Sequence, residues 1–217
     1  MFLSNGFAME EVQLNWYALK VFYNKVFEME DRLAGMGLET YLAVEMVLLK
    51  GEEHLAAARK LAQIPEGGRA DSRLVREGPL IYKRVPMVKS LIFVRADENE
   101  IIQVSEMLKG PVDLNKPEGF VYRTPDWQAF SIIPERQMTM FRLVTSSGDQ
   151  GLKFFSADDI TRFKQGEKVR VIEGPLKGAE GFIKRVQKNR RLLVGIDGVV
   201  AVATSFIPPM FLEKVMD

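Results

Sequence analysis

The sequence contains no cysteine and only one histidine, His54, among its 217 residues. Without cysteine the chain forms no disulfides and offers no thiolate ligands, which is usual for proteins of a reducing compartment. His54 lies in "EEHLAA", which lacks the His-Glu-x-x-His spacing of a zinc site, so a surface histidine is the simpler interpretation. We therefore expect no metal site and no cofactor.

The sequence also lacks a long hydrophobic run. No apolar stretch reaches the ~18–20 residues that a membrane-spanning helix requires. The N-terminus carries Glu10 and Glu11 and no basic start, unlike a secretory signal peptide. We expect a cytoplasmic protein that makes no contact with a membrane.

The familiar catalytic motifs are missing as well. The chain contains no G-x-S-x-G elbow, no P-loop and no Rossmann glycine fingerprint. The glycine-rich "GPLKGAEG" (Gly174–Gly181) joins two strand-like runs, so no helix N-terminus follows it to hold a phosphate. We therefore expect that the protein is not an enzyme.

A net charge of only +1 hides two basic regions. Residues 69–95 hold seven Lys/Arg against two Asp/Glu, and residues 161–195 hold ten against three, whereas residues 97–160 are acidic. Basic regions on a nearly neutral chain indicate local contacts with phosphate or with acidic surfaces. Solvated loops and faces are the alternative interpretation.

Residues 15–145 alternate between strand and helix patterns. Strands are expected at Asn15–Tyr23, Leu38–Lys50, Ser90–Arg95 and Gly119–Arg123, and helices at Asn24–Gly37, Asp97–Gly110 and Ile133–Thr145. The alanine-rich segment Gly51–Gly78 is expected to leave the sheet as an inserted excursion with a short helix. This order predicts an α+β fold, with an N-terminal α/β sandwich of helices against an antiparallel sheet.

The rhythm changes after a polar linker. Short strand candidates follow at close spacing, "EKVRVIE", "EGFIKRVQ", "RRLLVGI" and "VVAVAT", which is typical of a small five-stranded β-barrel. Such tight turns require backbone conformations that only glycine adopts freely, which explains Gly166, Gly174, Gly178 and Gly181. The expected divisions are an N-terminal domain 1–144 with the inserted segment 51–78, a linker 145–160 and a barrel domain 161–217.

These segments together resemble the NusG family of transcription elongation factors. "GEKVRVIEGPLKGAEGFIKRV" resembles the KOW motif of the SH3-like barrel of that family, "NWYALKV" its first strand, "SLIFVR" its central strand and "IPERQMTMF" its last helix. The inserted segment and "SLIFVR" look most like the specialised paralogs, the group that includes RfaH and the regulators of capsular polysaccharide operons. The resemblance covers residues 15–215.

The resemblance implies a protein that promotes processive elongation and antitermination by binding the clamp helices of RNA polymerase. On the matching strands it places Lys20, Val88, Leu91 and Phe120 in the polymerase-binding patch. Lys20 and Leu91 stand where the family has aromatic residues, so the expected patch is more aliphatic. Leu91 and Phe120 could instead be ordinary core residues.

Two further sites are expected. The basic residues of the insertion region are candidates for contact with the non-template DNA strand or nascent RNA, and Tyr82 among them could stack on a base. These residues are Arg69, Arg73, Arg76, Lys83 and Arg84. The alternative is an insertion whose charges are only solvated. In the barrel, Ile196 and Asp197 occupy the loop through which the family binds Rho or a ribosomal protein. Asp197 replaces an apolar residue there, and an unpaired carboxylate is costly to bury, so weak Rho binding or none is expected.

Two other functions stay open at this point. One is a housekeeping elongation factor of the NusG type, and the other is a ribosome-associated KOW protein that binds RNA.

Overall fold

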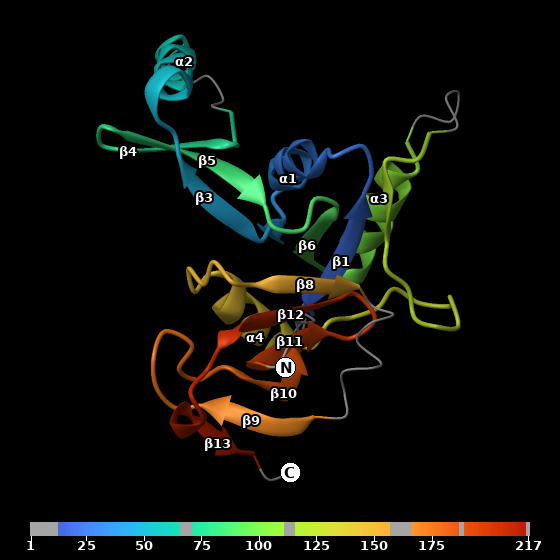
Figure 1. The fold of residues 1–217 in the computed structure, drawn as a ribbon. Coiled ribbons are helices and arrows are strands. Elements are labelled where there is room, and N and C mark those ends of the chain that lie inside the picture. Colours follow the sequence, from blue (N-terminus) through green and yellow to red (C-terminus); the bar gives the residue numbers. More distant parts are fainter. Residues whose placement is uncertain (1–12, 66–70, 111–115, 157–165, 187–188, 216–217) are drawn as a thin grey trace, which may run out of the picture.

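A computed structural model describes residues 13–65, 71–110, 116–156, 166–186 and 189–215 (Figure 1). An antiparallel sheet forms the centre of the N-terminal part, in the order β2-β6-β1-β7. Its strands are β1 (Asn15–Val21), β2 (Glu39–Tyr41), β6 (Leu91–Ala96) and β7 (Gly119–Val121). Strands are predicted around all four, but the single strand predicted at Leu38–Lys50 is wrong, because the chain breaks there into β2 and a second strand, β3 (Val44–Leu48), in a different sheet.

The two faces of this sheet are covered by different helices. Successive side chains of a strand point to opposite faces, so Tyr17, Leu19 and Val21 pack with α1 (Val26–Gly35) and α3 (Glu98–Leu108). Trp16 and Ala18 face the other way and pack with α4 (Glu135–Thr145). Asp97 and Glu100 form a reciprocal capping box that fixes the start of α3.

A separate lobe, here called the arm (residues 44–86), projects from the sheet (Figure 1). Its small sheet has the order β3-β5-β4, with strands β3 (Val44–Leu48), β4 (Leu74–Glu77) and β5 (Leu80–Pro86). Helix α2 (Gly51–Ala62) covers one face of it, since Leu49, Ala57 and Ile81 form a buried cluster. The insertion predicted at 51–78 is thus the outer half of a longer lobe.

The C-terminal sheet has six strands, in the order β13-β9-β10-β11-β12-β8. Five are β9 (Glu167–Val171), β10 (Glu180–Val186), β11 (Asn189–Ile196), β12 (Val200–Phe206) and β13 (Leu212–Lys214), which follows the 3-10 turn η2 (Pro209–Phe211). The sixth, β8 (Lys153–Ser156), comes from the predicted linker and pairs with β12. With β13 and β8 at the two ends of this order, closure into an SH3-like barrel stays a prediction.

The glycines of the KOW-like motif answer two different needs. Gly174 and Gly178 have φ of +85° and +90° in the turn between β9 and β10, a region that side chains disfavour. Gly166 and Gly181 permit close backbone approach, because a Cβ on Gly181 would lie 2.2 Å from the Leu193 carbonyl oxygen. Gly181 therefore lies within a strand, where a neighbouring strand passes too close for a side chain.

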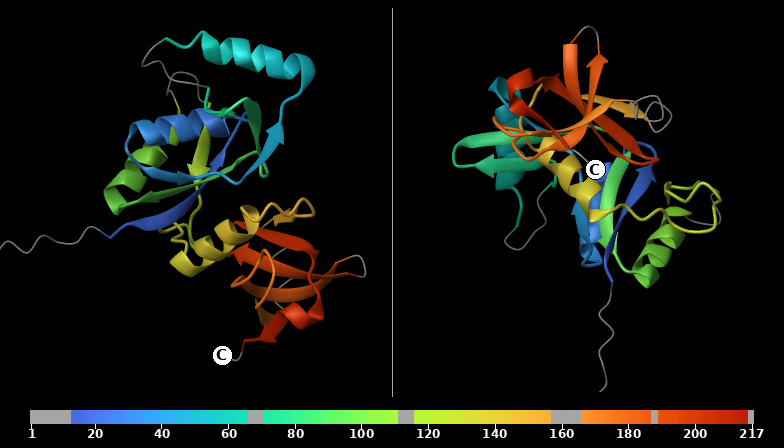
Figure 2. Two further views of the ribbon diagram at one scale, coloured as in Figure 1. Left: turned by 90° about the vertical axis from the view of Figure 1, so that its left-hand side faces the viewer. Right: turned by 90° about the horizontal axis from the view of Figure 1, so that it is seen from below.

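Helix α4 joins the two halves of the molecule (Figure 2). Its Phe141 contacts Phe93 of the N-terminal sheet, with ring centroids 5.3 Å apart. One buried cluster runs from Trp16 through α4 to Val194 and Ile207, so the two sheets share a core. None of the described helices is long and apolar enough to cross a membrane.

Candidate functional site

Three of the four residues predicted to bind polymerase form one row across the N-terminal sheet. Lys20 lies directly opposite Leu91 on one neighbouring strand and opposite Phe120 on the other. Residues directly opposite one another share a face of the sheet. The row Leu91–Lys20–Phe120, here called the docking row, therefore gathers three segments that lie far apart in the sequence.

The docking row borders a hollow of about 380 Å³ between the two sheets. Lys20, Val88, Leu91 and Tyr122 line it from the N-terminal side. The other side is lined by Phe154 and Phe155 of β8, Val200 of β12, and Val199 in the turn before β12. Leu91 is only 5% exposed, whereas Phe120 is 43% exposed. Leu91 is therefore a core residue in this arrangement, and Phe120 is the accessible member of the docking row.

Phe120 belongs to a small aromatic group. Its ring lies 6.0 Å from that of Phe22 and 5.4 Å from that of Tyr122, and Tyr23 beside them is 62% exposed with φ of +57°. Exposed aromatic side chains of this kind are enriched at protein interfaces. The surface around the accessible end of the row is therefore partly aromatic, where a more aliphatic patch was expected.

An exposed tryptophan was not among the predicted site residues. Trp127 is 74% exposed and has φ of +62°, in a loop after β7. Asp126 accepts a hydrogen bond from the Thr124 hydroxyl, which lowers the pKa of that carboxyl, and it also accepts one from the Gln128 amide. The Thr-Pro-Asp sequence before Trp127 is the signal that predicts such a turn.

The loop assigned to Rho or ribosomal protein binding faces α4. Ile196 is fully buried, so it is part of the core in this arrangement. Asp197 and Gln137 exchange two hydrogen bonds: the Gln137 side-chain amide donates to the carboxylate, and the Asp197 backbone amide donates to Gln137 Oε1, each at 3.1 Å. The carboxylate that distinguishes this loop thus serves a contact within the chain.

A second polar contact holds α4 on the C-terminal sheet. Arg136 of α4 forms an ion pair with Glu180 of β10. The Glu180 carboxylate also forms an ion pair with Arg170, at 2.7 Å. The hydrogen bond from Arg170 and the pairing with Arg136 hold the pKa of Glu180 below its ordinary value. Met140 Sδ accepts the Glu180 backbone amide at 3.3 Å, which completes the contact.

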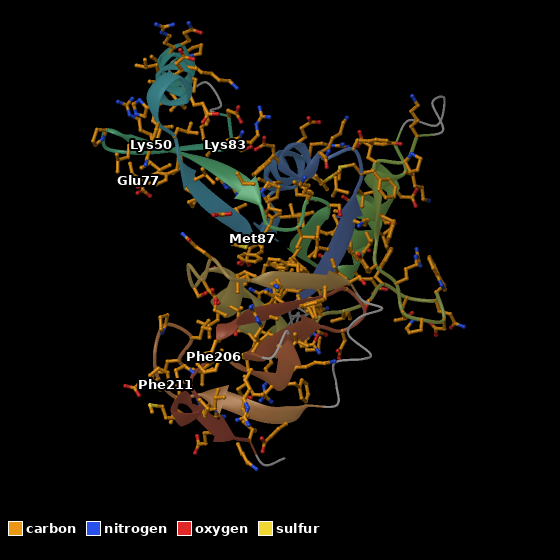
Figure 3. The ribbon with its side chains drawn as sticks, viewed as in Figure 1. Lys50, Glu77, Lys83, Met87, Phe206 and Phe211 are labelled. Atoms are coloured by element: carbon orange, nitrogen blue, oxygen red, sulfur yellow. The ribbon has the colours of Figure 1, made fainter. Side chains whose placement is uncertain are left out.

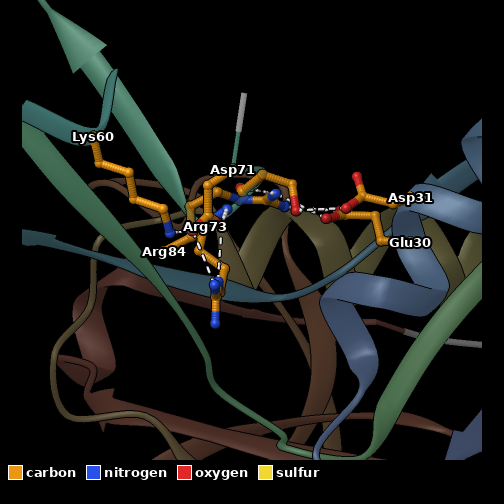
Figure 4. Close-up of polar contacts among 7 residues, drawn as sticks. Glu30, Asp31, Lys60, Asp71, Arg73 and Arg84 are labelled. Carbon is orange, nitrogen blue, oxygen red and sulfur yellow. Dashed lines mark hydrogen bonds and ion pairs between the residues drawn. The ribbon is translucent and has the colours of Figure 1, made fainter. Parts of the chain in front are cut away.

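Two of the predicted nucleic-acid contacts are engaged within the chain (Figure 4). Arg84 makes two hydrogen bonds of 2.8 Å to Glu30 of α1, and both side chains are largely buried. Arg73 and Lys60 pair with Asp71 at 2.8 and 2.6 Å, and these hydrogen bonds hold the pKa of Asp71 well below its ordinary value. These cations stabilise the arm and its contact with α1.

The other basic residues of that set are not gathered into one site. Arg76 and Lys83 are exposed, and Arg76 donates to the Gly78 carbonyl oxygen at 3.2 Å. Tyr82 is half-buried between Leu48 and Val75 on the opposite face of β5 from Lys83. Arg69 lies outside the described residues. A contact between the arm and nucleic acid stays a prediction that rests on Arg76 and Lys83.

Comparison with known proteins adds one finding. No family model and no curated protein matches the chain. Among solved structures, a structure concerned with domain interaction in Thermotoga maritima NusG matches with a TM-score of 0.40 and 16% identity, over 94% of this chain and 98% of that one. A likeness of this size leaves the function to be argued from the residues of the chain itself.

Proposed function

We propose that the protein is a NusG-like transcription factor that binds RNA polymerase with the docking row and performs no catalysis. The observation that carries the proposal is the docking row itself. Leu91, Lys20 and Phe120, which the resemblance places in the patch, come from three separate strands, and the fold brings them side by side, with the rings of Phe22 and Tyr122 close to that of Phe120. The order of elements and the KOW-like motif support the same proposal.

Binding through the whole row requires the two sheets to separate at least partly. Leu91 is buried, and β8 and β12 line the far side of the hollow. The polar contacts that resist separation are those of Arg136 and Gln137 with Glu180 and Asp197. We propose that polymerase binding competes with these contacts, and that separation also frees the loop at Asp197.

The proposed outcome of binding is processive elongation with reduced termination, on a long operon such as one for surface polysaccharide. The arm, through Arg76 and Lys83, is the proposed contact with DNA or RNA beside the polymerase. The carboxylate of Asp197 supports weak Rho binding, since Rho would have to bury it. A transcription assay with a downstream terminator would test this outcome: added protein increases read-through, and unchanged read-through contradicts it.

A binding assay with RNA polymerase tests the proposal directly. Phe120→Glu places a charge on the accessible end of the row, and we expect it to weaken polymerase binding by about tenfold or more, equivalent to about 1.4 kcal/mol. Ile102→Glu is the matched control, because Ile102 is 46% exposed on α3 at the other face of the sheet. Equal binding by both variants contradicts the proposal. Leu91→Glu is unsuitable, because it would bury a carboxylate in the core.

A further inference from the structure

A cleft of about 600 Å³ lies between the base of the arm and the C-terminal end of α4. It lies within the ~300–1,000 Å³ that binding pockets commonly occupy. One wall comes from the arm, with Val44, Glu45 and Met46, and the other comes from the residues after α4 and from β8. Figure 3 places Met87 at the base of the arm, where it also lines the cleft.

The cleft has an adaptable apolar floor. Leu42, Met46, Met87, Leu152 and Phe154 contribute to the lining. Met46 is 42% exposed, although it is a large apolar side chain. Methionine side chains adjust to partners of varied shape and are common on surfaces that bind peptides. The same face of the arm continues from Met46 to Leu48 and then across β5 and β4 to Tyr82 and Val75.

The charge of the cleft is negative. Its described lining residues include the carboxylates of Glu45 and Asp149 and no lysine or arginine. Burial alone would raise the pKa of Asp149, but hydrogen bonds from Ser205 and Gly151, together with the charge of Arg191, lower it. The negative end of the α4 dipole also points here, since α4 ends at Thr145.

Two arginines near the cleft are already engaged within the chain. Arg191, whose charge acts on Asp149, donates to the Gly151 and Thr204 carbonyl oxygens at 3.0 and 2.9 Å. Arg142 lies over the ring of Tyr41 at 5.2 Å and pairs with Glu39 at 3.6 Å. The Tyr41 and Thr145 hydroxyls, which both line the cleft, share a hydrogen bond of 2.6 Å. An apolar floor beneath carboxylates and a helix C-terminus suits a cation on an apolar stem, and it disfavours phosphate.

We propose that this cleft binds a segment of a partner protein that carries lysine or arginine among apolar residues. The stem of the basic side chain lies on Met46 and Met87, and its charged end reaches Glu45 and the end of α4. This site is separate from the docking row, and the proposal does not rest on the proposed function. Nucleic acid, which carries the opposite charge, is the occupant that the test has to exclude.

Calorimetric titration of the full chain with a short peptide of alternating leucine and lysine tests the site. We expect the wild type to bind this peptide and to bind neither the same peptide with glutamate in place of lysine nor a single-stranded oligonucleotide. Glu45→Lys should weaken binding by about tenfold, about 1.4 kcal/mol. Glu213→Lys, which makes the same charge change at an exposed site on β13, should leave binding unchanged.

Gln150→Lys supplies an independent check from the opposite wall, and thermal unfolding of each variant verifies that it folds. We expect Gln150→Lys to weaken peptide binding as Glu45→Lys does. Absence of wild-type binding, an equal loss with Glu213→Lys, or equal binding of the glutamate peptide or of the oligonucleotide would overturn the proposal.

Discussion

At the scale of single residues, the charged side chains divide into those that hold the chain together and those that face solvent. Arg84 is bonded to Glu30 and to the Ser72 carbonyl oxygen, whereas Lys83 beside it is exposed. The sequence shows both as members of one basic region. The two partners of Arg84 lie 54 and 12 positions away in the sequence, and no local pattern indicates such pairing.

The first prediction concerns the contact between the arm and α1. Arg84→Ala leaves the Glu30 carboxylate half-buried without its partner, and charge-assisted hydrogen bonds contribute ~1.5–3 kcal/mol each. We expect the free energy of unfolding in urea to fall by about 2 kcal/mol. Lys83→Ala is the control and should change it by less than about 0.5 kcal/mol. Equal effects of the two variants would show that the Glu30 pair does not hold the arm.

The second prediction concerns the strand glycine. A Cβ at Gly181 would lie 2.2 Å from a backbone oxygen of β11, so Gly181→Ala forces the two strands apart. We expect a loss of about 2–4 kcal/mol in the free energy of unfolding, typical of severe local overpacking. Gly35→Ala is the matched control, since Gly35 lies in a helix with open space around it, and it should stabilise by up to about 1 kcal/mol. A tolerated Gly181→Ala variant contradicts the close approach.

At the scale of elements, the sequence predicts the helices and most strands because each carries its own periodicity. The burial of Val26, Met29 and Leu33 follows the three- and four-residue spacing of α1. The sequence predicts neither β8 nor the break between β2 and β3 that places the inner part of the arm in a separate sheet. Lys153–Ser156 follows small polar residues typical of a linker, and its pairing with β12 depends on a strand about fifty positions later. Long-range pairing of this kind has no local signature.

The third prediction concerns the contact between α4 and β10. The pKa of Glu180 is lowered in the folded state, so its stabilising contribution is complete above the ordinary pKa of about 4.3. That contribution is lost as the pH falls through the lower, folded-state value. We therefore expect the midpoint of thermal unfolding to fall on acidification from about pH 6 to about pH 3. Glu180→Gln should flatten this dependence, and an unchanged pH profile in that variant would contradict it.

At the scale of the whole molecule, the C-terminal sheet lies against the N-terminal one, and the proposed function requires these contacts to open. α4 packs on both sheets, and a hollow separates the docking row from β8 and β12. The resemblance to a known family identifies the docking residues in the sequence, but the sequence does not show that Leu91 is buried. That burial results from packing between distant halves of the chain.

The fourth prediction concerns release of this packing. Gln137→Glu places a carboxylate opposite that of Asp197 and removes the 3.1 Å hydrogen bond that the Gln137 side-chain amide donates, whose typical net contribution is about 1 kcal/mol. The Asp197 backbone amide can still donate to an oxygen of the new side chain. If polymerase binds the separated form, the variant should bind it more tightly, by up to about tenfold. Glu135→Gln, a change at an exposed position two residues before Gln137, is the control. Weaker or unchanged binding by Gln137→Glu argues against competition between the two contacts.

We propose above all that this chain binds RNA polymerase through the exposed end of the docking row. A photo-reactive amino acid at Phe120, irradiated in the presence of purified polymerase and mapped by mass spectrometry, tests that claim most directly. We expect a cross-link to the clamp helices from position 120 and none from the same group at position 102. Equal cross-linking from both positions, or none from position 120 although the complex forms, would contradict it.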